Sequence, residues 1–531
     1  MTNKNLFASQ ALAQIPKILT LLDRNPHSPT YGCFDRTFWQ YKVIDFPAGM
    51  SQEFVYPLAL AYHCHLEGNI FYRQPIIKEW VEAGIVYAAQ SSHGDGSCDD
   101  YFPYERAAGA SAFALLACIE SYQLMNLDNS LVLDFFVKRG DWLAKHQESG
   151  RLTNHQALIV LCLEQLGRLL NSDRYQASQQ ERLEQVLAWQ NPEGWFIEYE
   201  GCDPGYHTLT ISCLARLYEL NPNPRIKQAL ILAVELAAQF VHPDGSYGGE
   251  YTSRNTYNFF PHGFELIGKW LPSALNINDR FLAGLANGLG ACYSDDRIIG
   301  HHTWNYLLAW QDFVEVRPPL QPRPQGRFHL QQGGILIDRR GDTELYLALN
   351  KGGVFKLFRD RQLIASDTQL SLVIRQGNKL KNAVGHLVDS YQIQLEAEQI
   401  TIAGNLGWAK QKQMNSLNLI VLRLVMFSFG RFFPNLIRQL LQKILITGKE
   451  DAPYHFKRCL SWQGANWQVT DRLEANSWEN IVAADIGGDR TSIYVVMSRT
   501  FQAGQLQSAW NLLPQIQNLA VNETWELTRK F

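Results

Sequence analysis

Four short polar clusters in the first half of the chain carry residue types that could do chemistry. They cover residues 99–106, 154–155, 198–207 and 248–257, and each follows a turn that recurs along the sequence. Amide, imidazole and guanidinium groups can bind an anion, and a phenol beside a positive charge can move a proton. Taken singly, each cluster is explained equally well by helix capping or by loop solvation.

The recurring turn contains a glycine, at Gly96, Gly150, Gly194 and Gly245, with a weaker fifth copy at 294–297. The copies are about 44 to 54 residues apart. A period near 50 with one turn in each unit predicts helix pairs, none of which can bury its apolar face alone. Such pairs often close into a ring, and a ring would bring all four polar clusters to one end.

The apolar periodicity changes along the chain and predicts two domains. Helical spacing continues to about residue 316, a proline-rich linker covers 317–326, and strand-like alternation follows. The predicted fold class is a multidomain α+β protein: an N-terminal α/α toroid (an incomplete helical barrel) at 1–316, then a C-terminal antiparallel β-sandwich at 327–531. The clearest helices are expected at 107–122, 156–170 and 208–220, and strands at 334–338, 343–349, 370–374, 391–397, 467–473 and 491–497.

Composition narrows the function classes. The 48 Lys and Arg residues nearly balance 51 Asp and Glu, so bulk charge gives no reason to expect nucleic acid as a partner. The nine cysteines are scattered without CxxC spacing, which indicates neither a disulfide framework nor a zinc site. The N-terminus lacks the compact apolar run of a signal peptide, which predicts a cytoplasmic protein. We expect no metal and no organic cofactor.

Residues 417–446 interrupt the strand pattern with a strongly apolar segment. Arg423, Arg431, Arg438 and Lys443 are spread along it, and Pro434 lies near its middle. A membrane-spanning helix needs about 20 apolar residues without such charges. One interpretation is a helical insertion packed on the protein's own surface. The other is an interfacial helix pair, which would make the protein membrane-associated through peripheral contact with an anionic membrane or a partner.

The pair Asn154-His155, followed about 52 residues later by Tyr206, resembles the heparinase II/III-like and alginate-lyase polysaccharide lyases. The order of a helical toroid and a β-sandwich is also similar. The resemblance implies a carbon–oxygen lyase that cleaves an acidic polysaccharide or oligosaccharide by β-elimination at a uronic acid. It implies that Asn154 and His155 neutralise the uronate carboxylate and that Tyr206 moves protons.

Further site residues are expected from the same clusters and from the later histidines. We expect Arg254, Glu200, His207, Tyr257, Tyr104 and His302 to bind substrate. A positive charge from Arg254 or His207 would lower the pKa of Tyr206 toward the range in which a tyrosine acts as a base. His262, His301, His302 and Tyr257 remain alternatives for a further catalytic residue.

Two other functions stay open at this point. A glycoside hydrolase on the same toroid would need two carboxylates about 5 to 9.5 Å apart. The clusters supply Asp99, Asp100, Glu105, Glu198, Glu200 and Glu250 as candidates. A non-catalytic glycan-binding or assembly protein of polysaccharide biosynthesis or export would use the apolar, basic insertion as its membrane or partner contact.

Overall fold

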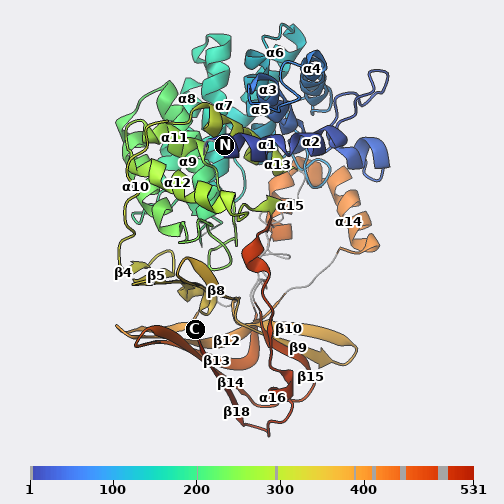
Figure 1. Cartoon of the computed structure of the whole chain (residues 1–531). Helices are drawn as coiled ribbons and strands as arrows, with labels where there is room; N and C mark the ends of the chain where they lie inside the picture. The colour runs from blue at the N-terminus through green and yellow to red at the C-terminus, as the bar shows by residue number, and fades with distance from the viewer. Residues whose placement is uncertain are drawn as a thin grey trace.

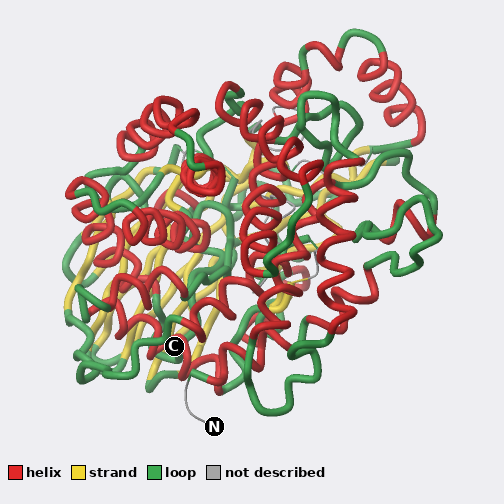
Figure 2. The backbone as a smooth tube through the Cα atoms, turned by 90° about the horizontal axis from the view of Figure 1, so that it is seen from above, coloured by secondary structure: helices red, strands yellow, loops and turns green. Residues whose placement is uncertain are grey.

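The computed structural model describes residues 4–199, 201–293, 297–387, 390–409, 414–442, 450–487 and 500–531. Helices form the first part of the chain and strands the second, and the two parts are stacked (Figure 1). Viewed from above, the helices lie over the strands (Figure 2). The last long helix of the first part, α13, ends at Gln311, and the first long strand, β4, begins at Gly326. The predicted order of a helical toroid and a β-domain is therefore confirmed.

The helices of the first part form a ring with an inner and an outer layer. Each inner helix contacts the next, and the last contacts the first, so the described helices form the predicted toroid. Helix α1 packs on α13 and supplies the last outer position. The inner helices are α3 (Val55–His63), α5 (Ala108–Leu124), α7 (Thr153–Leu170), α9 (Pro204–Leu220), α11 (His262–Gly268) and α13 (Ile299–Gln311). The outer helices are α4 (Pro75–Gln90), α6 (Ser130–Lys145), α8 (Gln176–Ala188), α10 (Pro224–Ala237), α12 (Ser273–Ala286) and α1 (Asn5–Leu12), with α2 (Ile15–Leu21) beside α1.

Each of the four clear recurring turns needs glycine because of its backbone conformation. Gly96, Gly150, Gly194 and Gly245 all have φ between 85° and 98°, a region that residues with a Cβ rarely adopt. A Cβ on Gly96 would also lie 2.4 Å from the backbone nitrogen of Arg139 in α6. The turns at Gly96, Gly194 and Gly245 therefore pass close to an outer helix before the chain enters the next inner helix, whereas a Cβ on Gly150 would meet nothing within 4 Å.

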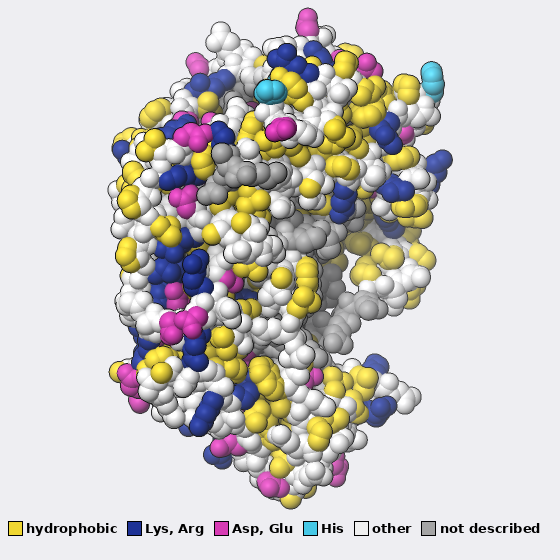
Figure 3. Space-filling model, in the orientation of Figure 1, with side chains coloured by type: hydrophobic (Ala, Val, Ile, Leu, Met, Phe, Trp, Pro, Cys, Tyr) yellow, Lys and Arg dark blue, Asp and Glu magenta, His cyan; other side chains and the backbone are white. Residues whose placement is uncertain are grey.

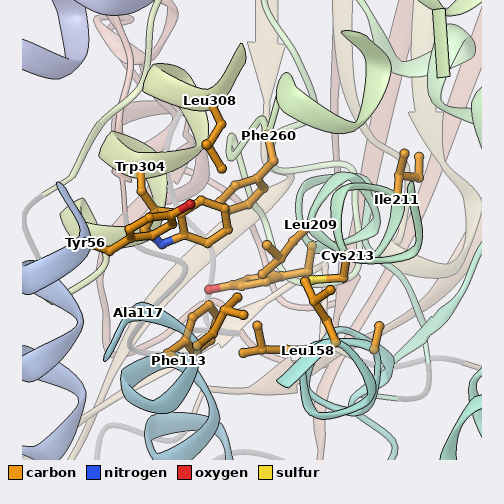
Figure 4. Close-up of a cluster of buried hydrophobic side chains, with 14 of the residues drawn as sticks. Tyr56, Phe113, Ala117, Leu158, Leu209, Ile211, Cys213, Phe260, Trp304 and Leu308 are labelled. Atoms are coloured by element: carbon orange, nitrogen blue, oxygen red, sulfur yellow. The ribbon is translucent and has the colours of Figure 1, made fainter. Parts of the chain in front are cut away.

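Large apolar side chains fill the middle of the ring. Phe113, Leu158, Leu209, Phe260 and Trp304 come from different inner segments and are all buried. Figure 4 shows these side chains meeting between the inner helices, and we refer to the five as the central core cluster. This cluster separates the two ends of the ring axis.

Two antiparallel sheets form the second part and share one core. Ile335 and Ile337 of the smaller sheet pack into the helical core, whereas Leu336 and Leu345 pack against the larger sheet. The smaller sheet is thus covered on both faces, which explains its continuous apolar runs, and the predicted sandwich is present. Its order is β4 (Gly326–Leu330), β5 (Ile335–Arg340), β6 (Thr343–Ala348), β7 (Val354–Arg359) and β8 (Gln362–Asp367).

The larger sheet has the order β17-β15-β9-β10-β12-β13-β14-β18, with β11 paired to β12. Its strands include the regions predicted at 370–374, 391–397 and 467–473, whereas 491–497 lies outside the described residues. The bounds are β9 (Leu370–Gln376), β10 (Lys379–Val384), β11 (Gln392–Leu395), β12 (Gln399–Trp408), β13 (Asp451–Gln463), β14 (Asn466–Ala475), β15 (Ile481–Ile486), β17 (Trp510–Asn511) and β18 (Thr524–Lys530). The second part also contains the helix α16 (Leu513–Ile516). Two short strand pairs lie outside the two sheets: β1 (Ile197–Glu198) with β2 (Gly201–Cys202), and β3 (Cys292–Tyr293) with β16 (Thr500–Phe501).

The apolar insertion forms two helices, α14 (Ser416–Phe427) and α15 (Pro434–Gln442), and its predicted end at 443–446 lies outside the described residues. Met426 and Ile437 pack on Phe102 of the helical part. Most other large apolar side chains of the insertion are exposed, and Figure 3 shows hydrophobic side chains gathered on that edge of the molecule. Among the described helices, none has the length and apolarity needed to cross a membrane.

Candidate active site

The site residues lie at the amino-terminal ends of successive inner helices. Asn154 and His155 are in the first turn of α7, and Tyr206 is in the first turn of α9. Asp203 caps α9, since its side chain accepts a hydrogen bond of 3.1 Å from the backbone nitrogen of Tyr206. Arg254 lies on the loop after the fourth glycine turn. The helix-pair repeat therefore brings these residues to the same end of the ring.

A buried chain of contacts joins Asn154 to Tyr206. Glu198 accepts hydrogen bonds from the backbone nitrogen (2.7 Å) and from Nδ2 (2.8 Å) of Asn154. Arg254 Nη1 lies 3.6 Å from Glu198 Oε2, and the Arg254 guanidinium carbon lies 4.3 Å from the centre of the Tyr206 ring. The structure thus brings together three of the predicted site residues, with Glu198 between them.

His155 is held by a second set of contacts that includes the insertion. Its Nδ1 lies 2.7 Å from Glu148 Oε2, and the other oxygen of Glu148 lies 2.6 Å from Arg438 Nη1 of α15. The imidazole ring rests against Gly109 of α5, where a Cβ would lie 2.5 Å from the His155 Cε1 atom. The side chain of His155 keeps 19% of its surface exposed, so it is the predicted catalytic residue most open to solvent.

Burial and charge act in opposite directions on the acidic groups of the site. Burial raises the pKa of Glu198 to about 7, although Arg254 and Asn154 favour the charged form. Burial also acts on Glu148, but His155 and Arg438 more than offset it and lower the pKa of that carboxyl to about 2. Glu148 is therefore ionised at neutral pH, whereas Glu198 titrates near it.

The expected lowering of the Tyr206 pKa is wrong. Arg254 does favour the phenolate, but burial of the ring outweighs it, and the pKa of Tyr206 is raised. His207 cannot help, because burial lowers its own pKa to about 4 and leaves it neutral. Tyr206 is therefore a protonated phenol at neutral pH.

Two predicted substrate-binding histidines point away from this cluster. Neighbouring residues on a helix point about 100° apart, so His207 faces α10, where its Nε2 lies 3.0 Å from the Ala233 carbonyl oxygen. His302 stacks on Phe260 at 4.3 Å and lines a cavity of about 300 Å³ beside α1. Glu200 lies outside the described residues.

Two other predicted residues, Tyr257 and Tyr104, contact the strands and the insertion that cover the ring. The Tyr257 hydroxyl donates to Glu250, which also pairs with Lys356 of β7 at 3.0 Å. Tyr104 lies where the insertion packs, with its ring 5.5 Å from that of Phe427. These side chains line the boundary between the helical ring and the segments that cover it.

The remaining histidine candidates for a further catalytic role are buried and do not contact the cluster directly. His301, in the first turn of α13, bonds Glu53 at 2.9 Å and stacks at 4.4 Å on Phe113, whose ring lies 6.3 Å edge-on from that of His155. His262 bonds Asp312 at 2.8 Å, near the carboxyl end of α13. The groups that support the cluster are instead Glu148 and Arg438, which the sequence did not single out as site residues.

Comparison with known proteins identifies the fold. No protein-family model matches the chain, and no curated protein matches its sequence. The structure is similar to chondroitin AC lyase of Streptomyces coelicolor A3, solved in complex with chondroitin sulphate, with a TM-score of 0.52 and 12% identity over 92% of this chain and 68% of that one. Heparinase III gives a TM-score of 0.49 and 12% identity over 81% of this chain and 63% of that one. The chain thus spans about two thirds of the length of these enzymes, and it has the heparinase- and chondroitinase-like lyase fold.

Proposed function

We propose that this chain cleaves a uronic-acid-containing glycan by β-elimination. The observation that carries the proposal is the meeting of Asn154, His155, Tyr206 and Arg254 at one end of a toroid with the fold of chondroitin AC lyase. The reaction removes the proton at C5 of the uronate, forms a double bond between C4 and C5, and releases the oxygen on C4. It needs a group that neutralises the carboxylate, a base and an acid.

The contacts support a division of these roles. An ionised Glu148 fixes the proton of His155 on Nδ1, which leaves the lone pair of Nε2 to accept the C5 proton. Tyr206 is a protonated phenol and can give its proton to the departing O4. The proton taken by His155 would then return to Tyr206 through solvent, which restores the starting state.

Asn154 and Arg254 would stabilise the developing enolate. Glu198 takes one hydrogen of the Asn154 amide, and the second would bond the substrate carboxylate. Asn154 Oδ1 is buried without a hydrogen-bond partner among the described residues, a costly arrangement of the kind that functional sites retain. Loss of the Asn154 amide donor should lower the reaction rate by about 10²–10³, as loss of one oxyanion-hole donor does.

The direct test is incubation with a panel of uronate polymers, followed by ultraviolet absorbance for an unsaturated uronate. A lyase gives the absorbance with each new chain end. New reducing ends without absorbance would instead support hydrolysis, which the two buried acids Glu105 and Glu198 favour, since burial raises the pKa of each to about 7. Glycan binding without either product would support a non-catalytic binding or assembly protein.

We also propose that α14 and α15 make peripheral contact with an anionic membrane, which would place the protein at a cytoplasmic membrane surface. Leu417, Ile420 and Leu424 lie along one exposed stripe of α14, and residues 414–442 contain no acidic residue. The basic contribution is smaller than the sequence suggested. Arg423 pairs with Asp45 and Arg438 turns into the candidate site, so the apolar stripe would supply most of the attraction.

A further inference from the structure

A cavity of about 490 Å³ lies at the far end of the ring from the candidate active site. The course of α9 shows the separation: Tyr206 belongs to the site, Leu209 to the central core cluster, and Arg216 lines the cavity. Ten residues of helix separate Tyr206 from Arg216, which corresponds to about 15 Å. The cavity is therefore a compartment of its own.

Two residues that line this cavity each have a buried polar atom with no hydrogen-bond partner among the described residues. One is Nη1 of Arg216, whose Nη2 donates to Glu120, and the other is Nδ1 of His262. Both side chains are more than nine-tenths buried. Since the Nε2 of His262 donates to Asp312 and burial lowers the pKa of the ring, its Nδ1 carries a lone pair. The lining residues thus carry one unused donor and one unused acceptor, both closed to solvent, which a bound ligand would reach through a small rotation of either side chain.

The charges of the cavity are already matched within the protein. Arg216 pairs with Glu120, and Lys269 pairs with Glu219 at 3.1 Å. Asp312 adds a third carboxylate, so the lining has no surplus of positive charge for an anion. An acidic glycan, the substrate class of the proposed active site, is therefore disfavoured here.

Hydroxyl groups fit these conditions, because each can both donate and accept a hydrogen bond. Leu60, Leu266 and Leu308 add apolar surface that would contact the C–H face of a sugar ring. A volume near 490 Å³ lies in the usual range for small-molecule sites, about 300–1,000 Å³. We propose that this cavity is a second binding site, for a neutral sugar, and the proposal holds whether or not the chain is a lyase.

Saturation-transfer NMR on the full chain tests the proposal, with glucose, N-acetylglucosamine and glucuronate as probes at tens of millimolar. Both neutral sugars should give a signal, and glucuronate a weaker one. Leu124 lines the cavity, so Leu124→Trp should fill part of it and abolish the signal. Leu131→Trp, at an exposed position of α6, is the control and should leave the signal unchanged. The double variant Arg216→Met, Glu120→Gln removes the ion pair without leaving a lone charge, and it should also lose the signal.

The same experiment separates this site from the candidate active site. Tyr206→Phe should bind the neutral sugars as the natural chain does. A signal that survives in Leu124→Trp, or that disappears in Tyr206→Phe, would place the sugar elsewhere and overturn the proposal. A cavity that holds only water would give no signal with either neutral sugar, and that result would overturn it as well.

Discussion

Replacing Arg438 with glutamine should loosen the contact that holds His155. Arg438 Nη1 lies 2.6 Å from Glu148 Oε1, and the other oxygen of Glu148 lies 2.7 Å from His155 Nδ1. The pKa of Glu148 falls from 4.5 to about 2, which corresponds to roughly 3 kcal/mol of net favourable interaction shared by the two partners. Losing one partner of this buried carboxylate should lower the free energy of unfolding by about 1–3 kcal/mol.

The activity of Arg438→Gln should change in rate and in pH dependence. A loosened His155 should lower kcat/KM by about 10- to 100-fold, as small displacements of reacting groups do. The acidic limb of the pH–rate profile should move to higher pH, because the pKa of Glu148, which Arg438 helps to lower to about 2, would rise, and the carboxylate that holds His155 would be protonated at a higher pH. The shift is measured as the difference between Arg438→Gln and the natural chain, because the other ionisable groups around Glu148 and His155 are the same in both. These groups are His146, Glu105, Glu198 and Tyr199.

Diethyl pyrocarbonate labelling of the peptide containing His155, followed by mass spectrometry, checks the loosening without turnover. The reagent modifies the imidazole, so a loosened ring should be labelled faster in Arg438→Gln than in the natural chain at the same pH. Arg438→Lys keeps the charge and should give a smaller change, and Arg431→Gln, an exposed change in the same insertion, should give none. An unchanged labelling rate and an unchanged pH profile in a folded Arg438→Gln protein would refute the link between the insertion and His155.

Three further predictions follow from the site and the insertion. Because the pKa of Glu198 is raised in the folded protein, its protonated form stabilises the fold fully below about pH 4.5, and this stability is lost as pH rises through about 7. Glu198→Gln should therefore flatten the pH dependence of the free energy of unfolding between these two values. An unchanged slope would contradict the assignment. Gly109→Ala should displace the His155 ring and lower turnover by about tenfold or more, and near-normal activity would show that the ring can shift without cost. Ile420→Glu with Leu424→Glu should abolish co-sedimentation with anionic liposomes, and equal, negligible sedimentation of natural and variant chains would remove the membrane proposal.

The sequence predicts the architecture and one side of the site because both depend on local patterns. The glycine turns repeat with the helix pairs, so the positions of Asn154, Tyr206 and Arg254 after successive turns place them at one end of the ring. The change from helical to alternating periodicity likewise marks the start of the sandwich. The glycine turns and the change in periodicity can be recognised in the sequence because each depends on only a few neighbouring residues.

The missed features depend on contacts between distant segments. Arg438 reaches Glu148 only because the insertion folds back from the larger sheet onto the helical ring, and no local spacing indicates this. The protonation state of Tyr206 depends on how deeply its ring is buried, which the adjacent charges in the sequence do not reveal. His207 follows Tyr206 directly in the sequence, but it faces α10, because successive residues on a helix face different neighbours.

The most direct test of the central claim compares Tyr206→Phe with Tyr175→Phe on a uronate glycan that the natural chain cleaves. Tyr175 is a buried tyrosine whose hydroxyl bonds Val137 among the outer helices, so it controls for loss of a buried hydroxyl. Formation of the unsaturated product, followed by ultraviolet absorbance, should stop in Tyr206→Phe and continue in Tyr175→Phe, with substrate still bound in both. Elimination at a near-natural rate in Tyr206→Phe would contradict the assignment of Tyr206 as the acid and, with it, the proposed site.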